Sequence, residues 1–370
     1  MMIVTGIFIC YFLLLMMLLV GWKKAMSVPL GEPTGKEPLI SVIIPVRNEE
    51  MTISKILGNL IAQEYKNFEV IIVNDDSEDE TLWMASQCDL KNINIIHNKG
   101  VGKKAAIASG VAAARGSIIV TTDADCSVSP AWLKVIRAQF RDPKTMFAFG
   151  GVRMEGESGF FDALQAMEFA SLIGVGASTA ALRAPTMSNG ANLAFRKKVF
   201  GEVKGYQGNV QIPSGDDEFL MRKVRAVYPG GIRFINHPDA IVTTRTQPTP
   251  EAFFNQRIRW ASKWRYNSSR DTKALAVAVA LFQVAFIANW VLVFTPLILQ
   301  SLFFIVVKMI LEAAILLQVC RFLRTRWNWL AFFSLQVVYP FYVIGVAAAS
   351  FFRPFEWKHR IYKPEKGLFR

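Results

Sequence analysis

The sequence predicts an α/β domain with a mostly parallel sheet, set between apolar segments that are long enough to cross a membrane. Short apolar runs alternate with amphipathic stretches between residues 39 and 123, which is typical of parallel strands joined by helices. Uncharged segments lie near both ends of a chain that is 52% hydrophobic and 19% charged over 370 residues. This composition is more apolar than that of an ordinary soluble domain and excludes a disordered chain.

The first apolar segment, at 3–20, carries no charged residue. As a helix it would extend about 27 Å, close to the ~30 Å apolar core of a bilayer. Lys23 and Lys24 follow it, no basic residue precedes it, and no small-residue cleavage site comes after it, so we favour an anchor over a signal peptide. We expect a transmembrane anchor at 1–22 with the following chain in the cytoplasm, and a Pro- and Gly-rich linker at 23–38.

Four short apolar runs predict the strands of the sheet. We expect them at 39–45, 68–73, 93–97 and 117–123. The amphipathic stretches between them predict helices at about 49–64, 79–88 and 103–114. Parallel strands present their carboxyl ends at one edge of the sheet, where ligands bind. The polar residues at these strand ends are therefore the first candidates for a functional site.

Several common activities are disfavoured by missing motifs. No G-x-G-x-x-G follows the first predicted strand, which disfavours a nicotinamide or flavin cofactor. Gly102-Lys103-Lys104 lacks the upstream glycine and the following hydroxyl residue of a P-loop. The chain has three histidines and four cysteines, without metal-binding spacing, so a histidine-rich metal site or a Ser-His-Asp triad is hard to assemble.

Acidic residues end two of the predicted strands. Asp75 follows the second strand, where a carboxylate could accept hydrogen bonds from a base or ribose, or could cap the next helix. Asp123 and Asp125 follow the fourth strand and would project to the same side of an extended segment. Such hard oxygen ligands suit Mg²⁺ or Mn²⁺ beside substrate phosphates, and turn or capping chemistry is the alternative.

Two more polar groups lie further along the chain. Asp216 and Asp217 open a helix predicted at about 216–226, where the helix dipole could stabilise them or one could act as a general base. Gln256, Arg259 and Trp260 lie close to one helix face before the second apolar zone. Arginine can bind a phosphate and tryptophan can stack on a sugar, although a basic interfacial helix would also explain the pattern.

The second apolar zone predicts two membrane helices within 274–319, joined near Thr295-Pro296. Lys308 and Glu312 share a helix face and could pair there, or could reach the membrane surface from one end of the helix. A third run follows at 329–352. A full crossing by this run would place the basic tail outside, against the positive-inside rule, so a re-entrant or interfacial path stays open.

The order of the polar motifs resembles that of the family 2 glycosyltransferases, which have the GT-A fold. The motifs are SVIIPVRNEE, VNDDSED, GKKAA, TDADC, SGDDEFL and QRIRW. The resemblance spans about residues 39–265 and is closest to the membrane-integrated branch that includes cellulose, chitin and hyaluronan synthases and ceramide glucosyltransferase. It implies a Rossmann-like, parallel-rich sheet with one N-terminal and two to three C-terminal membrane helices. Residues 357–362 are also similar to a W-K-G-R-x-Y ending of some lipid-directed members, with His359 in place of Gly.

The resemblance implies a role for each motif residue. Donor nucleotide sugar would contact Pro45, Arg47, Glu49, Asp75, Lys103 (or Lys104) and Asp123. Asp123 and Asp125 would hold Mg²⁺ or Mn²⁺, and Asp217 would be the catalytic base. The acceptor or the diphosphate would contact Asp216, Gln256, Arg259 and Trp260. The domain containing these residues would end in an interfacial helix at about 265, followed by a membrane region at 266–352.

The implied reaction is an inverting transfer of a sugar, expected from a UDP-sugar, to a hydroxyl of a membrane-associated acceptor. We favour a lipid acceptor because the spans are few and because of the tail motif. A processive polysaccharide synthase is the alternative, and it would need a homo-oligomer or a partner subunit to complete a channel. A catalytically inactive binding protein is disfavoured because all the acidic motif residues are present.

The net charge of +13 is concentrated near the membrane segments. Residues 22–254 hold 26 basic and 25 acidic residues, whereas residues 255–370 hold 16 and 4. We therefore expect the basic residues, including those of the tail at 353–370, to seat the chain on anionic lipid, and we expect no nucleic-acid partner. The expected location is the cell or inner membrane, with the catalytic domain in the cytoplasm.

Overall fold

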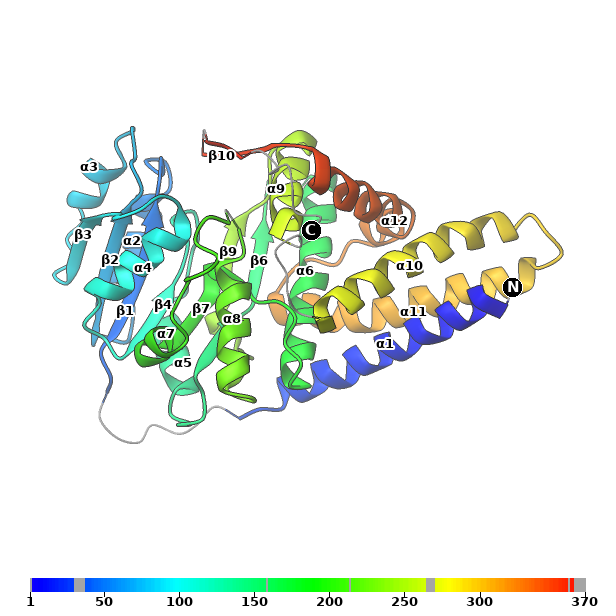
Figure 1. Ribbon diagram of the computed structural model, residues 1–370, viewed down its shortest axis with the longest axis horizontal. Coiled ribbons are helices and arrows are strands. Elements are labelled where there is room, and N and C mark those ends of the chain that lie inside the picture. The colour runs from blue at the N-terminus through cyan, green and yellow to red at the C-terminus, as the bar shows by residue number, and fades with distance from the viewer. Residues whose placement is uncertain are drawn as a thin grey trace.

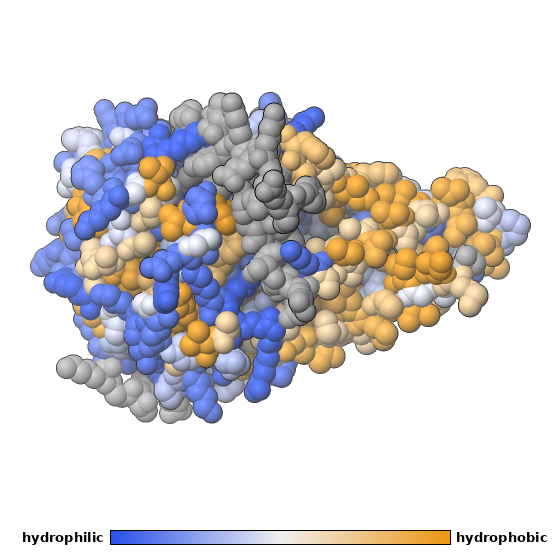
Figure 2. Space-filling view, viewed as in Figure 1, coloured by the Kyte–Doolittle hydropathy of each residue, from blue (hydrophilic) through white to orange (hydrophobic). Residues whose placement is uncertain are grey.

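An α/β body and a bundle of long helices lie at opposite ends of the computed structural model (Figure 1). Figure 2 shows polar surface over the α/β body and apolar surface over the long helices. The structure describes residues 2–29, 37–157, 159–212, 214–263, 270–358 and 360–362. Part of the predicted linker, His359 and the tail from residue 363 lie outside these ranges.

A seven-stranded sheet in the order β3-β2-β1-β4-β7-β5-β8 forms the centre of the body. Its strands are β1 (Ile40–Val46), β2 (Phe68–Asn74), β3 (Ile93–His97), β4 (Ile118–Thr121), β5 (Phe147–Gly150), β7 (Leu193–Arg196) and β8 (Ile232–Ile235). All neighbours are parallel except β7, which runs antiparallel to β4 and β5. The parallel-rich α/β sheet is therefore confirmed, with one reversed strand.

The strands form where the sequence places continuous apolar runs. β2 is buried along its whole length and β1 along almost all of it, as expected for parallel strands covered on both faces. A second, small parallel pair consists of β6 (Val152–Glu155) and β9 (Val242–Arg245). It lies beside the main sheet, on the side of the long apolar helices (Figure 1).

The helix predicted at about 49–64 is wrong at its start, because α2 spans only Ile53–Ile61. The preceding backbone instead bonds to the loop after β2: Glu49 N–H donates to Thr81 Oγ1 at 2.7 Å and Asn48 N–H donates to Ser77 Oγ at 3.2 Å. These bonds join the carboxyl ends of β1 and β2 into one rigid edge. The remaining body helices are α3 (Thr81–Ser86), α4 (Lys103–Ala113), α5 (Trp132–Gln139), α7 (Lys197–Glu202), α8 (Asp216–Val227) and α9 (Pro250–Ser262).

One long helix, α6 (Phe160–Ala181), was not predicted from the sequence. It packs against α1 (Met2–Met26) and runs across the ends of the long helices (Figure 1). The contact is so close that a Cβ on Gly21 would meet the Ser178 carbonyl oxygen at 2.6 Å. α6 thus joins the α/β body to the apolar bundle.

The apolar runs fold as predicted into long helices: α1, α10 (Arg270–Leu292), α11 (Ile298–Leu323) and α12 (Trp329–Phe352). Together with α6, they give five helices among the described residues that are long and apolar enough to cross a membrane. The chain reverses between α10 and α11 at the predicted Thr295-Pro296 turn.

Near the start of α12, Phe332 is buried in the core cluster that also contains Val319 and Leu323 of α11. The end of α12 lies against α9, where Val346 packs with Ile258. The chain then forms a hairpin of β10 (Phe355–Trp357) and β11 (Arg360–Tyr362) on the same side. The re-entrant or interfacial path of 329–352 stays a prediction, and α12 is long and apolar enough to cross a membrane.

Lys308 and Glu312 pair within α11, as their spacing predicted, with Nζ and Oε2 2.9 Å apart. Lys308 is only 4% exposed and also donates to Gln336 Oε1 at 2.6 Å, while Tyr11 donates to Glu312 Oε1 at 2.6 Å. The pair is therefore satisfied inside the bundle rather than at a helix end. Such a charge pair is tolerated among apolar helices because each partner is neutralised and hydrogen-bonded.

Candidate active site

The carboxyl ends of β1, β2 and β4 open on a cavity of about 1440 Å³. All the residues that the sequence placed in the site line this cavity: Pro45, Arg47, Glu49, Asp75, Lys103, Asp123, Asp125, Asp216, Asp217, Gln256, Arg259 and Trp260. The same cavity extends between the long helices as far as Tyr11, Gln283 and Lys308. It therefore connects the polar strand ends to the apolar bundle.

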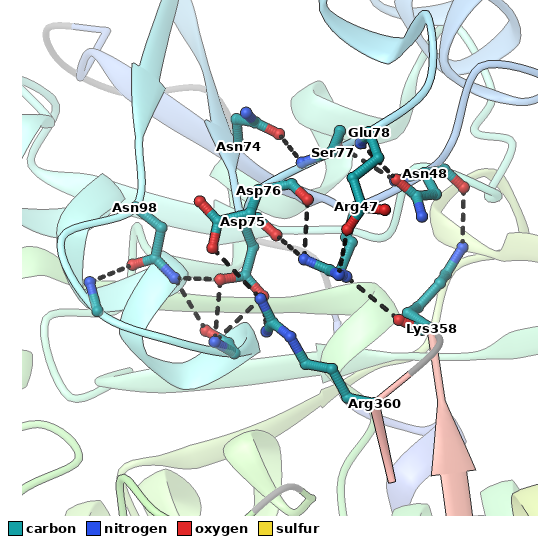
Figure 3. A network of polar contacts seen from close by, with 12 residues as sticks. Arg47, Asn48, Asn74, Asp75, Asp76, Ser77, Glu78, Asn98, Lys358 and Arg360 are labelled. Atoms are coloured by element: carbon teal, nitrogen blue, oxygen red, sulfur yellow. Dashed lines mark hydrogen bonds and ion pairs between the residues drawn. The ribbon is translucent and has the colours of Figure 1, made fainter.

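Asp75, just after β2, is only 3% exposed, and hydrogen-bond donors surround its carboxylate. Asn98 Nδ2 donates to Oδ1 at 2.7 Å, and the Gly102 N–H lies 3.0 and 3.1 Å from the two oxygens. Arg360 Nη1 from the tail completes the set at 2.7 Å from Oδ2 (Figure 3). Sequence reasoning missed Asn98, although Asn98 directly follows β3, which neighbours β2 in the sheet.

Arg47 holds the loop after β2 in shape. Its Nη1 donates to the carbonyl oxygens of Asp75 and Asp76, both at 2.8 Å, and its Nη2 pairs with Glu78 at 3.2 Å (Figure 3). These bonds explain why an arginine follows β1 at this position. They also fix the backbone that carries the Asp75 carboxylate.

Lys103, rather than Lys104, lies among the acidic residues. Lys103 Nζ is 2.5 Å from Asp123 Oδ1 and 3.7 Å from Asp216 Oδ2. Burial lowers the pKa of Lys103, but these two carboxylates outweigh it and hold the pKa well above its usual value. Lys104 instead donates to the backbone oxygens of Asn209 and Ile212, at 2.9 and 3.0 Å, and supports the wall of the site.

Asp123 and Asp125 lie in a turn and not in an extended segment, so that part of the prediction is wrong. β4 already ends at Thr121, and the Cys126 N–H closes the turn on the Asp123 carbonyl oxygen at 3.2 Å. Burial, then Asp123 and Glu49, raise the pKa of Asp125 to about 6. The turn therefore holds two neighbouring carboxylates whose negative charge a cation would stabilise.

The carboxylates fit Mg²⁺ or Mn²⁺ by the chemistry of their oxygens. Within the described parts of the chain, no group of three or more His, Cys, Asp or Glu side chains could hold a metal ion by itself. Protein sites for these ions often use one or two carboxylates and leave other positions to substrate phosphates. Asp123 and Asp125 match such an incomplete site.

The three acids at the start of α8 have different surroundings. Glu218 pairs with Lys263 at 2.7 Å and with Arg222, and Asp216 faces Lys103. Burial raises the pKa of Asp217 to about 6, with Asp216 and Glu218 adding to this and Lys263 opposing it. Asp217 is therefore the member of the group that is best suited to accept a proton.

A buried ion pair that sequence reasoning missed fixes α9 against α6. Arg257 Nη2 lies 2.5 Å from Glu168 Oε2, and both side chains are almost wholly buried. The Arg257 guanidinium also lies 4.2 Å from the centre of the Trp260 ring, which it holds at the cavity wall. Arg257 stands inside the noted Gln256–Trp260 motif, but nothing in the sequence linked it to Glu168.

Two basic residues of the tail lie at this site and not at the membrane surface, which corrects the expectation for them. Besides Arg360, Lys358 Nζ pairs with Glu49 Oε1 at 2.7 Å. Both cations form ion pairs with buried or half-buried carboxylates at the strand ends. Their positive charge is therefore balanced by acidic residues of the same chain.

Comparison with known sequences supports the motif assignment. Residues 41–203 match the sequence profile of the family described as glycosyl transferase family 2. Poly-β-1,6-N-acetyl-D-glucosamine synthases of Staphylococcus aureus (strain COL) and Staphylococcus epidermidis are each 26% identical over 264 residues. That match covers 68% of this chain and 62% of each relative, which is less than two thirds of their length.

Comparison with solved structures supports the fold. A mannosyltransferase from Pyrobaculum calidifontis, PcManGT, in complex with GDP-Man and Mn²⁺, superimposes with a TM-score of 0.57 at 18% identity. The superposition covers 94% of this chain and 95% of that chain, so it includes the long helices as well as the sheet. The shared architecture is the GT-A fold.

Proposed function

We propose that the protein, whose residues 41–203 match the glycosyl transferase family 2 profile, transfers a sugar from a nucleotide-diphosphate donor to a hydroxyl of a membrane-associated acceptor. The single observation that carries the proposal is the shared cavity. It joins the acidic strand ends to the long apolar helices, and its volume of about 1440 Å³ would hold a donor and part of an acceptor. A usual small-molecule site is smaller, at roughly 300–1,000 Å³.

In the proposed mechanism the chain's own residues position both substrates. Lys103 and Arg259 bind the diphosphate, and Asp217 takes the proton from the acceptor hydroxyl. The hydroxyl oxygen bonds to the anomeric carbon from the face opposite the diphosphate as the bond to the leaving oxygen breaks, so the configuration inverts. Mg²⁺ or Mn²⁺ held by Asp123 and Asp125 would offset the diphosphate charge.

The comparisons favour a polysaccharide as the acceptor over the lipid favoured from the sequence. The curated relatives are named as synthases of a polysaccharide, and we propose a growing glycan as the first candidate here. Lys308, Glu312, Gln336 and Tyr11 put a hydrogen-bonded polar group on the cavity wall, which suits sugar hydroxyls. A lipid acceptor is the second candidate because Leu14 and Leu18 of α1 also line the cavity.

A panel of labelled nucleotide sugars tests the proposed function and separates the two acceptors. Membranes containing the protein are incubated with UDP- and GDP-sugars and Mn²⁺, then extracted with organic solvent, and the labelled product is sized. A ladder of products that stays out of the solvent is expected. One sugar on an extractable lipid would support the second candidate instead, and no transfer from any donor would contradict the proposed function.

The pH dependence of the transfer rate should follow Asp217. With saturating donor, the rate should fall about tenfold per pH unit below pH ~6, because the protonated carboxyl cannot accept a proton. Lys263→Met should move the midpoint to higher pH, since the Lys263 cation lowers the pKa of Asp217.

Lys223→Met is the matched control for this profile. Lys223 lies on α8 as well, but it donates to the backbone oxygens of Gly205 and Gln207. The control should leave the midpoint unchanged. A midpoint that stays the same in Lys263→Met would show that another group controls the profile.

A further inference from the structure

One buried carboxylate, that of Glu168 on α6, contacts both α9 and α12. Glu168 Oε2 accepts from Arg257 Nη2 of α9 at 2.5 Å, and Glu168 Oε1 accepts from Arg257 Nε at 3.4 Å. Oε1 also accepts from the Tyr342 hydroxyl of α12 at 3.3 Å. Figure 1 shows these three helices lying together where the α/β body joins the long helices. Glu168 therefore connects three helices at one buried point.

Arg257, the partner of Glu168, contacts two cavity-lining residues of its own helix. Its Nη1 donates to Gln256 Oε1, and its guanidinium lies 4.2 Å from the centre of the Trp260 ring. An arginine guanidinium is planar, stacks on aromatic rings and donates its N–H groups in fixed directions. The orientation in which Glu168 holds this guanidinium therefore sets where the Gln256 and Trp260 side chains lie.

Two further residues of α6 support α9 beside this ion pair. The Phe169 ring centre lies 5.8 Å from that of Trp260. Gln165 exchanges two hydrogen bonds with the backbone of Gln247, ahead of α9: its Nε2 donates to the carbonyl oxygen at 3.0 Å, and its Oε1 accepts from the N–H at 2.8 Å. Residues three positions apart share a helix face, so Gln165 and Glu168 act from the same side of α6.

Stability alone does not explain a charged pair at this place. The Arg257 and Glu168 side chains are only 3% and 5% exposed, and apolar residues that replace such a buried pair are often neutral or stabilising. A guanidinium and a carboxylate do fix each other's direction, because their hydrogen bonds run in parallel. The pair is therefore better suited to orient α9 than to stabilise the fold.

We propose that Glu168 is a positioning residue for sugar transfer, which acts through Arg257 to hold Gln256 and Trp260 against the acceptor. The inference rests on the proposed function and takes Gln256 and Trp260 as acceptor contacts. Their orientation decides whether the acceptor hydroxyl lies in line with the anomeric carbon. A displacement of about 1 Å from such a geometry can cost about 10²-fold in rate.

Glu168→Gln in the full chain, in lipid nanodiscs, tests this role. The substitution keeps the size of the side chain but removes its charge and one of the two oxygens that accept from Arg257. With saturating donor, the transfer rate per nucleotide-binding site should fall about 10–100-fold. The affinity for UDP or GDP with Mn²⁺ should stay close to that of the wild type, because the strand ends at Asp75 and Asp123 are unchanged.

Glu69→Gln is the matched control. Glu69 is also a buried carboxylate, 4% exposed, with an arginine partner, Arg115 Nε at 2.7 Å. It lies near the amino end of β2, at the edge of the sheet opposite the cavity. Its transfer rate per nucleotide-binding site should equal that of the wild type, even where less folded protein is recovered.

Arg257→Lys is a second test, which keeps a positive charge beside Glu168. A lysine therefore leaves no lone buried charge, but its ammonium lacks the planar fork of the guanidinium. This variant should also lose transfer rate and keep nucleotide binding, so it tests the proposal even where Glu168→Gln fails to fold.

A cycle with Trp260→Leu separates positioning from a structural role. In the Trp260→Leu background, Glu168→Gln should slow transfer several-fold less than in the wild type, because the positioned ring is absent. An equal factor in both backgrounds would overturn the proposal. Wild-type transfer in Glu168→Gln, or a matching loss of transfer and of UDP and GDP binding, would also overturn it. No transfer by the wild type from any donor would instead contradict the proposed function.

Discussion

Asp217→Asn should reduce sugar transfer by about 10²–10⁴-fold and leave donor binding close to that of the wild type. The amide keeps the shape of the side chain but cannot accept the proton of the acceptor hydroxyl. Burial raises the pKa of Asp217 to about 6, whereas the neighbouring acids face cations: Asp216 faces Lys103 and Glu218 pairs with Lys263. The rate at saturating donor and the affinity for the nucleotide should be measured on the same protein preparation.

Asp216→Asn is the matched control for that substitution. Asp216 is the preceding residue, but it faces Lys103 at 3.7 Å, so its loss should weaken donor binding more than the rate at saturation. Transfer at the wild-type rate in Asp217→Asn would show that Asp217 is not the base. A loss of rate confined to Asp216→Asn would move that role to Asp216.

Asp125→Asn should remove the part of donor binding that depends on Mg²⁺ or Mn²⁺. The substitution removes a carboxylate whose pKa is raised by burial and by the neighbouring Asp123 and Glu49. A bound cation would stabilise the ionised form of this carboxylate. Loss of a ligand should weaken binding of Mn²⁺ at least about tenfold, since changes beside metal ligands already cost about 10–100-fold. Titration of UDP and GDP with Mn²⁺ and with a chelator measures the metal-dependent part directly.

Cys126→Ala serves as the control for Asp125→Asn. The Cys126 thiol lies 3.6 Å from Asp125 Oδ1, so this change alters the surroundings of the carboxylate and keeps its charge. The metal-dependent gain in nucleotide binding should survive in Cys126→Ala. An equal loss of binding with and without metal in Asp125→Asn would contradict a ligand role.

Local patterns in the sequence predict much of the sheet but not every helix boundary. Strands such as β2 are buried over their whole length, so they appear as unbroken apolar runs with clear ends. The start of α2 was placed too early because residues 48–50 bond to the loop after β2, which lies about 30 residues away. α6 was missed because its small, apolar and polar residues face neighbours on several sides and show little amphipathic pattern.

For the candidate site too, local sequence signals reveal the acidic residues but not the residues that contact them from far away in the sequence. Asp75, Asp123 and Asp217 stand directly after strands or at a helix start, so the sequence alone brings them to attention. The residues that pair with these acids, or that support the cavity wall, lie far from their partners in the sequence. Arg360 is 285 residues from Asp75, and Arg257 is 89 residues from Glu168. No periodicity or motif spacing reports such pairs, which depend on how the tail and α6 return to the sheet.

The anomeric configuration of the product tests most directly whether this cavity is a sugar-transfer site with one base. A donor sugar that is α-linked to its diphosphate is supplied to the wild-type protein in nanodiscs, and the new glycosidic bond is assigned by NMR. A single displacement by a hydroxyl that Asp217 deprotonates predicts a β-linked product, which Asp217→Asn should not form. An α-linked product, or sugar released only to water, would contradict that mechanism.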